Sequence, residues 1–297
     1  MKKINLSILI LIISIISLYT TLNNIYAEDI NDVVANENII TNDTINSGII
    51  DEDTINNMDI KDINPSNIKL EDKDSYARVY NNLSKKLILP DGYTDTENEF
   101  NNLPMETKNI LNNMNKLEKI GTILMKKENY QANNTDIKFK SAGSPSGFSR
   151  LSKGDILITS DNKSYHVIRH GHAAMLVDGS TIIEAVRSGV RKYKYDWLSR
   201  YNNCYASRVY GGKNKFENTN KTWAQTAADW ACGKVGTPYK ITSDKDTIKT
   251  FYCSQLVYRS YLSASKRKID LSEGAKYIWP MGLYYNSNTY RIAMYEK

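Results

Sequence analysis

Cysteine and histidine are the scarcest reactive residues of this 297-residue sequence, with three of each. Small disulfide-stabilised proteins use many cysteines in place of a core, so three cysteines exclude that class. Hydrophobic residues make up 41% of the chain and charged residues 24%, which excludes a fully disordered protein and suffices for one large core or two small ones. The histidines all lie between His166 and His172, so any histidine chemistry has to take place there.

Charge is distributed unevenly along the chain, although the net charge is only +6. Residues 28–75 hold three lysines against 13 acidic residues, whereas residues 136–297 hold 26 basic against 13 acidic residues. A basic body therefore follows an acidic leader. The sequence contains no nucleic-acid-binding motif, so the basic charge does not indicate a nucleic-acid partner. In an exported protein it is suited instead to anionic polymers of a cell envelope.

The first 27 residues have the layout of a bacterial secretory signal peptide. Lys2 and Lys3 precede an apolar run over residues 6–18, and a polar stretch ends at Ala27. We predict cleavage after Ala27 and a secreted or envelope location. An uncleaved membrane anchor is the alternative, because residues 4–22 are almost long enough to span a bilayer.

Two different regions are predicted between the signal peptide and the basic body. Residues 28–75 mix Asn, Asp and isolated Ile without a helical or alternating period, which predicts a disordered leader. Residues 76–140 form a predicted helical region, because apolar residues recur every three or four positions between Pro104 and Lys127. Gly121 is expected to weaken or stop that helix. We expect the helix to pack on the domain that follows it.

Residues 145–297 are predicted to form a single α+β domain. Strand-like runs cover residues 155–159, 172–177 and 181–186, and helical patterns cover residues 223–235 and 253–263. The Gly143 to Gly147 segment is a linker rather than the nucleophile elbow of a serine hydrolase, since Pro145 holds the central position.

Cys253 opens the last predicted helix. The positive end of the helix dipole and the free backbone N–H groups would lower the pKa of its thiol. A buried structural cysteine is the alternative for a lone Cys. Cys204 and Cys232 could pair with each other in an oxidising exterior, which the sequence leaves open, and we expect them to be unpaired.

His172 and Glu184 lie on two strands joined by Asp178-Gly179, a hairpin signal. A three-residue turn would place Glu184 opposite Ala174, on the face of His172 and diagonal to it. A two-residue turn would place Glu184 on the other face. A carboxylate bound to one ring nitrogen orients an imidazole and leaves the other nitrogen to accept a thiol proton.

The order of several short motifs resembles the permuted members of the NlpC/P60 papain-like superfamily, of the YiiX/YebB type. These motifs are Gly154-Asp155, Gly171-His172, Asp178-Gly179, Ile183-Glu184-Ala185, Gly236-Thr237-Pro238-Tyr239 and Tyr252-Cys253-Ser254. The resemblance covers about residues 145–290 and implies an antiparallel sheet packed on helices. It implies Cys253 as nucleophile, His172 as base, Glu184 as the residue that orients His172, and Tyr239 as an oxyanion donor. Gln255 departs from the acidic residue expected two positions after the cysteine.

The resemblance implies a cysteine peptidase or amidase-type hydrolase that cleaves a peptide or isopeptide amide, in cell-wall peptidoglycan. A thiol-dependent acyltransferase or hydrolase acting on lipid-linked acyl groups is the alternative, and a wall-binding module with a decayed site is a third. We predict no cofactor, no metal and no obligate protein partner, because the histidines are not followed by acidic or cysteine ligands at a recognisable metal spacing.

Overall fold

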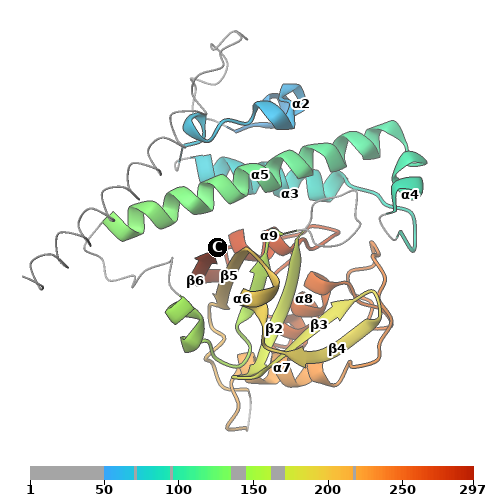
Figure 1. The fold of residues 1–297 in the computed structure, drawn as a ribbon. Coiled ribbons are helices and arrows are strands. Elements are labelled where there is room, and N and C mark those ends of the chain that lie inside the picture. Colours follow the sequence, from blue (N-terminus) through green and yellow to red (C-terminus); the bar gives the residue numbers. More distant parts are fainter. Residues whose placement is uncertain (1–49, 70–71, 94–95, 135–144, 162–170, 217–218) are drawn as a thin grey trace, which may run out of the picture. The chain divides into compact units, whose positions relative to one another are not determined.

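The computed structural model describes residues 50–69, 72–93, 96–134, 145–161, 171–216 and 219–297, all of them within one compact unit, Ser47–Lys297 (Figure 1). The predicted signal peptide and residues 28–49 of the predicted leader lie outside the described residues. In the described part of the chain, no helix is both long and apolar enough to cross a membrane.

A six-stranded antiparallel sheet forms the centre of the C-terminal domain. Each of its two central strands, β1 and β2, pairs with a strand on both sides, and β1 and β5 are buried along almost their whole length. In sheet order the strands are β4 (Gly189–Lys194), β3 (Thr181–Val186), β2 (His172–Asp178), β1 (Ile156–Thr159), β5 (Asn203–Val209) and β6 (Thr289–Glu296).

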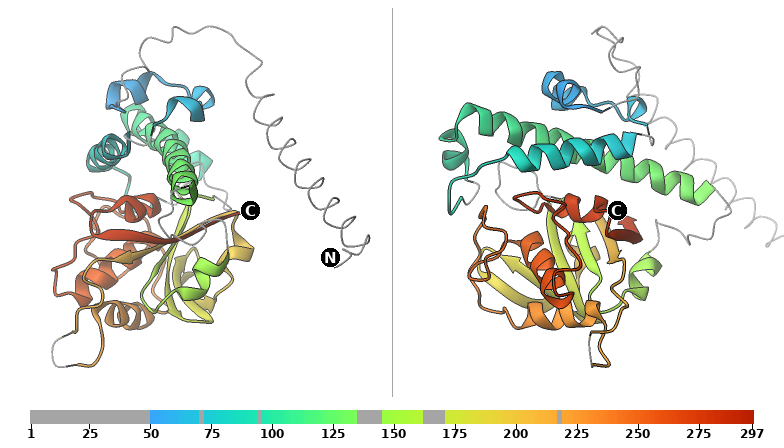
Figure 2. Two further views of the ribbon diagram at one scale, coloured as in Figure 1. Left: turned by 90° about the vertical axis from the view of Figure 1, so that its left-hand side faces the viewer. Right: turned by 180° about the vertical axis from the view of Figure 1, so that it is seen from behind.

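Helices cover both faces of this sheet (Figure 2). Side chains alternate along a strand, so Ala173 and Met175 of β2 join one core cluster and Ala174 and Leu176 join another. The first cluster packs against α7 (Trp223–Cys232), α8 (Cys253–Ala264) and α9 (Pro280–Tyr285), and the second against α6 (Trp197–Arg200) and η4 (Pro145–Arg150). The predicted α+β class, with an antiparallel sheet packed on helices, is confirmed.

The N-terminal helices are α3 (Lys73–Lys86), α4 (Glu97–Asn101) and α5 (Met105–Asn134). The sequence predicts a helix over residues 104–127, and α5 continues seven residues further. Gly121 does not stop this helix, which continues through it to Asn134. A Cβ at position 121 would lie 2.7 Å from the hydroxyl of Tyr76, so glycine allows α3 to approach α5 closely.

The prediction that the whole of residues 28–75 is disordered is wrong for residues 50–69. This segment holds α2 (Glu52–Asn57), η1 (Ile60–Asp62) and η2 (Pro65–Asn67). Four of its isoleucines, separated by irregular intervals, are buried in the core of the helical region: Ile50, Ile55, Ile63 and Ile68. These isoleucines share one core cluster with residues of α3 and α5, so contacts across the fold order a segment that has no period.

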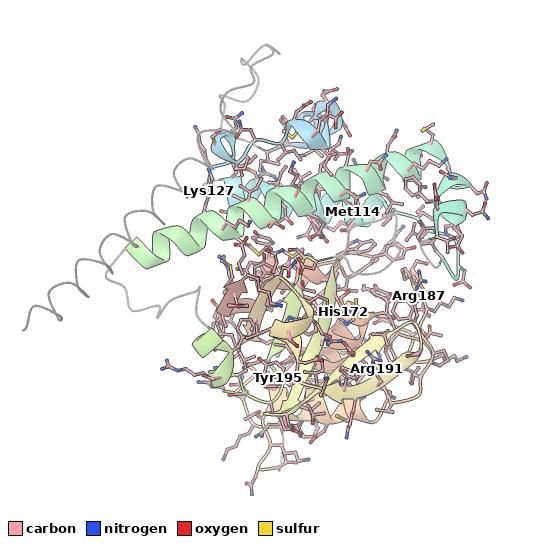
Figure 3. The ribbon with its side chains drawn as sticks, in the orientation of Figure 1. Met114, Lys127, His172, Arg187, Arg191 and Tyr195 are labelled. Atoms are coloured by element: carbon pink, nitrogen blue, oxygen red, sulfur yellow. The ribbon has the colours of Figure 1, made fainter. Side chains whose placement is uncertain are left out.

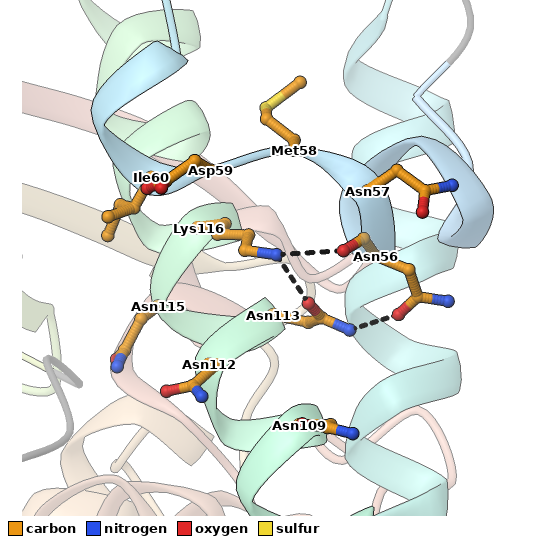
Figure 4. Close-up of a pocket in the computed structure, with 10 residues that line it drawn as sticks. All are labelled: Asn56, Asn57, Met58, Asp59, Ile60, Asn109, Asn112, Asn113, Asn115 and Lys116. Atoms are coloured by element: carbon orange, nitrogen blue, oxygen red, sulfur yellow. Dashed lines mark hydrogen bonds between the residues drawn. The ribbon is translucent and has the colours of Figure 1, made fainter.

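Lys116 of α5 binds the C-terminal end of α2 (Figure 4). Its ammonium donates to the carbonyl of Ile55 at 2.8 Å and to Oδ1 of Asn113 at 3.1 Å. The amide of Asn113 donates in turn to Oδ1 of Asn56 at 2.5 Å. These bonds surround a cavity of about 750 Å³ lined mainly by asparagines. The lysine satisfies the carbonyls at the end of α2, which a helix cannot satisfy internally.

The helical region packs on the C-terminal domain, as we expected for the predicted helix. Its core cluster includes Tyr252, Tyr277 and Trp279 of the C-terminal domain. The hydroxyl of Tyr285 donates to the carbonyl of Gly121 at 2.8 Å, and the hydroxyl of Tyr277 accepts from the N–H of Leu89 at 3.0 Å. The helices therefore bury Tyr252, the residue that precedes the candidate nucleophile.

Candidate active site

Cys253 is the first residue of α8, as the sequence predicts, and its side chain is buried. Tyr252 is the N-cap in extended conformation, and its N–H donates to the side chain of Gln255 at 3.3 Å. Ser254 donates to the carbonyl of Ile278. Neighbours on both sides of Cys253 are thus fixed, so the sulfur is held at the positive end of the helix.

The hairpin of β2 and β3 confirms the predicted pairing of Ala174 with Glu184, but by a different route. The sequence predicts this pairing for a three-residue turn. In the structure Asp178 pairs with Thr181, which leaves two residues in the turn, and the register shifts between Leu176 and Asp178. A β-bulge supplies the extra residue that the turn lacks, so Glu184 still lies on the face of His172.

The three residues predicted to act together are brought together by the fold, and Figure 3 marks His172 at the start of β2. Nε2 of His172 lies 2.9 Å from Oε2 of Glu184. The ring of His172 also shares a hydrogen bond with the thiol of Cys253. With Nε2 on the carboxylate, Nδ1 is the nitrogen left for the sulfur. The side chain of His172 is 14% exposed and that of Glu184 is fully buried.

The electrostatics of this chain favour a charged pair. Burial would lower the pKa of His172, but its hydrogen bonds to Cys253 and Glu184 outweigh burial and raise the pKa to about 9. Burial would raise the pKa of the Cys253 thiol, and the bond to His172 outweighs it, so this pKa is lowered. The contact between the two side chains therefore favours thiolate together with imidazolium over the neutral pair.

Sequence reasoning missed two arginines that bind Glu184. Nε and Nη2 of Arg191 lie 3.0 and 2.8 Å from Oε1, and Arg200 contacts both carboxylate oxygens at 3.2 and 3.1 Å. Burial would raise the pKa of Glu184, but His172 and Arg200 outweigh burial and keep this pKa well below its usual range. Arg191 lies directly opposite Glu184 in the β3–β4 pair, so predicting β4 would have revealed it.

Tyr239 and Gln255 both contact backbone near Cys253. Tyr239 forms a parallel bridge with Phe251, two residues before Cys253, and its half-buried ring packs against both neighbouring cores. The amide of buried Gln255 donates to the carbonyls of Asp244 and Lys245, both at 3.3 Å. A neutral amide therefore occupies the position where an acidic residue was expected, and it binds backbone rather than a cation.

The remaining cysteines and histidines lie elsewhere. Cys204, Cys232 and Cys253 form no disulfide with one another, and Cys204 and Cys232 lie in or against the cores on opposite faces of the sheet. His166 and His170 lie outside the described residues. Among the residues that the structure describes, no three His, Cys, Asp or Glu side chains form a group that could hold a metal ion.

Comparison with known proteins assigns the C-terminal domain. Residues 150–274 match the family described as permuted papain-like amidase enzyme, YaeF/YiiX, C92 family. The match spans His172, Glu184 and Cys253 in the permuted order, with the histidine ahead of the cysteine, which confirms the resemblance seen in the sequence. It also confirms the class of enzyme predicted, a cysteine peptidase or amidase type.

Two relatives illustrate how far the similarity of this domain extends. The protein YycO of Bacillus subtilis (strain 168) is 31% identical over 160 residues, which are 50% of this chain and 60% of YycO. The chain thus spans about 60% of the length of that relative. The crystal structure of metalloprotein yiiX from Escherichia coli O157:H7 has 18% identity and a TM-score of 0.35, and the match covers 49% of this chain and 98% of that one.

Proposed function

We propose that this protein is an exported cysteine amidase that hydrolyses a peptide or isopeptide bond, with Cys253 as nucleophile, His172 as base and acid, and Glu184 as the residue that orients His172. The observation that carries the proposal is the continuous chain of contacts from the thiol through the imidazole to a buried carboxylate at the start of a helix. The amidase description of the matched family supports it.

The reaction follows from these contacts. The Cys253 thiolate attacks the amide carbonyl carbon, and its negative charge passes to the carbonyl oxygen. The N–H of Cys253 lies in the first helical turn, where it has no acceptor within the helix, and stabilises that oxyanion. The Tyr239 hydroxyl is the second donor that the resemblance implies. The His172 imidazolium then protonates the leaving nitrogen as the C–N bond breaks, which leaves a thioester on Cys253.

Water completes the cycle. His172, now neutral, takes a proton from a water molecule, whose oxygen attacks the thioester carbonyl. The C–S bond breaks, the carboxylic acid leaves, and the thiolate–imidazolium pair is restored. Glu184 keeps the ring oriented through both halves of the cycle without itself taking a proton.

The substrate that we propose is cell-wall peptidoglycan. The signal peptide predicted in residues 1–27 would deliver the protein to the envelope. The 26 basic residues against 13 acidic ones in residues 136–297 would raise its concentration near anionic wall polymers. Peptide cross-links in such a wall are amide bonds that an exported enzyme meets at high local concentration.

Digestion of purified peptidoglycan tests this function. The parent protein should release peptide fragments that mass spectrometry identifies, and Cys253→Ala should release none. Cys204→Ala is the matched control, because Cys204 is equally buried but its sulfur lies against the carbonyls of Trp197 and Tyr201. If the parent left peptidoglycan intact while Cys253 became acylated by a lipid-linked acyl donor, the alternative acyl-transfer function would replace the proposed one.

A further inference from the structure

The positive charge around Glu184 exceeds the single negative charge of its carboxylate. Arg191 of β4 binds Oε1 through two nitrogens, and Arg200 at the end of α6 binds both oxygens. His172 uses Oε2 at 2.9 Å. Two permanent cations and one titratable group therefore surround a single fully buried negative charge.

Arg200 has little contact with water, so solvent screens its charge weakly. Its side chain is 20% exposed, its Nε lies 2.9 Å from Oδ1 of Asp196, and its guanidinium carbon lies 5.3 Å from the ring centroid of Trp197 and 5.2 Å from that of Tyr201. Trp197 also stacks on the ring of His172, with 5.7 Å between centroids. Because Arg200 and His172 bind the same oxygen of Glu184, they are close neighbours, and two cations so placed repel each other.

We propose that Arg200 and Arg191 are positioning residues that act on His172 through Glu184, fixing the carboxylate and limiting how strongly it stabilises the imidazolium. The inference rests on the proposed function, since it concerns the proton that His172 must release. A histidine held as imidazolium by an uncompensated buried carboxylate would be a poor acid for the leaving nitrogen. Sharing Glu184 among three partners keeps the ring oriented and its proton transferable.

The two arginines differ in strength. Arg200 shares Oε2 with His172, whereas both contacts of Arg191 are to Oε1, on the far side of the carboxylate. Arg191 is also 40% exposed, so water screens its charge more. Several elements bring titratable or charged groups to His172, either directly or through Glu184. Among the described residues these groups are Cys253 (α8), Glu184 (β3), Arg191 (β4), Asp196 and Arg200 (beside and in α6), and Tyr201.

The test measures the protonation of His172 without substrate. In the full chain carrying Cys253→Ala, ring NMR signals of only three histidines are present, and His172→Ala identifies the relevant one. Arg200→Met should move the His172 titration upward by roughly 0.5 to 1 pH unit, because a repelling cation is lost. Arg191→Met should move it upward by less, and Arg200→Lys and Arg191→Lys should leave it within about 0.2 unit.

Lys192→Met is the matched control for charge. Lys192 neighbours Arg191 on β4 but is exposed and faces the other side of the sheet, so its loss should not move the titration. In the parent with Cys253 intact, the alkaline limb of kcat/KM should follow the same order as the NMR shifts. If Arg200→Met fails to fold, the titration of His172 is compared in Arg191→Met and Arg191→Lys, because Arg191 is more exposed and its replacement disturbs the core less.

The outcomes separate this inference from the proposed function. An unchanged or downward titration in Arg200→Met and Arg191→Met would overturn the role of the arginines, whether or not the protein cleaves amides. Upward shifts without amide cleavage by the parent would refute the proposed function and leave the positioning role standing. A fall in kcat/KM with an unmoved alkaline limb would reduce both arginines to a purely structural role.

Discussion

Two buried glutamates, one in each region of the molecule, take opposite charge states. Glu184 in the sheet is fully buried and binds His172 and two arginines. Glu118 in the helical region is 7% exposed, and its Oε1 accepts from the hydroxyl of Tyr80 at 3.1 Å. Its Oε2 has no hydrogen-bond partner among the described residues.

The pKa values of the two carboxyls diverge accordingly. Burial raises the pKa of Glu118 to about 8, and the single phenol bond of Tyr80 offsets only part of this. At Glu184 burial acts in the same direction, but His172 and Arg200 outweigh it and the pKa falls well below its usual range. The comparison shows that the charge of the partners, rather than burial, decides whether a buried carboxyl in this protein is ionised.

The largest expected effect comes from removing the two residues beside Glu184 that carry out the chemistry, His172 and the Cys253 that it contacts. Cys253→Ala and His172→Ala should each lower kcat/KM on peptidoglycan fragments by at least about 10³-fold, and the double variant should be no slower than either. Tyr80→Phe, which removes the partner of Glu118 instead, should leave turnover unchanged. A double variant much slower than both single ones would mean that the two residues do not act as one unit.

Glu184→Gln should have the next largest effect. It keeps an acceptor for His172 but loses the charge that stabilises imidazolium, so kcat/KM should fall roughly 10²-fold, less than in the Cys253 or His172 variants. Unfolding in urea should show a loss of roughly 3 kcal/mol, because the arginines lose their counter-charge in a buried site. Equal loss of activity in all three variants would show that Glu184 does more than orient the ring.

The pH dependence of Cys253 alkylation tests the lowered pKa of the thiol beside the ionised Glu184. Below the lowered pKa of the thiol, its proton returns, so alkylation by iodoacetamide should slow about tenfold per pH unit. Amide turnover should also fall as pH rises through about 9, because His172 then lacks the proton for the leaving nitrogen, while alkylation should not fall. An alkylation rate that rises only near pH 9 would show an ordinary thiol.

Glu118→Gln tests whether the buried carboxyl of Glu118 is neutral in the folded protein. A raised pKa in the folded state means that the stability from neutral Glu118 is complete below the unfolded value, near 4.5, and is lost as pH rises through about 8. The parent should therefore become less stable between pH 5 and pH 8 in urea unfolding, and Glu118→Gln should lose most of that slope. At pH 8 the variant should be more stable than the parent, the opposite of Glu184→Gln. A variant with the slope of the parent would exclude Glu118 as its source.

Gly121→Ala should give the smallest effect and probes the packing beside Glu118. Alanine gains about 1 kcal/mol of helix propensity, but its Cβ would meet the hydroxyl of Tyr76, whose ring lies 4.6 Å from that of Tyr285. We expect a net loss of about 1 kcal/mol in thermal or urea unfolding. Gly179→Ala is the control, since its Cβ would meet nothing within 4 Å. If Gly121→Ala were more stable than the parent, the side chain of Tyr76 would have to have moved away from the new Cβ.

Local signals explain which parts of the fold and site could be predicted from the sequence. Alternation and helical period located β2, β3 and the helix that Cys253 opens, because each is set by residues within a few positions. The Cys253, His172 and Glu184 grouping came from those elements and from the resemblance. β4, β5 and β6 were not predicted, since edge strands such as β4 carry mixed polar side chains with little burial signal.

The parts that could not be predicted depend on contacts across the fold. Arg200 reaches Glu184 from a four-residue helix, which has too few positions for a period. The isoleucines of residues 50–69 are buried by residues of α3 and α5 far along the chain, so their irregular spacing gives no local pattern. The role of Gly121 depends on Tyr76, 45 positions away, and a helical glycine alone does not reveal a close approach.

The bulge between Leu176 and Asp178 has a consequence for how this hairpin can change in length. Deleting Val177, the residue between them, would give a regular hairpin with the same two-residue turn, and Ala174 would still pair with Glu184. Straightening the bulge without a deletion would instead slip the pairing by one residue and turn Glu184 to the face opposite His172. The bulge therefore reconciles a two-residue turn with the number of residues between His172 and Glu184, so this hairpin can lose its bulge only if it loses one residue as well.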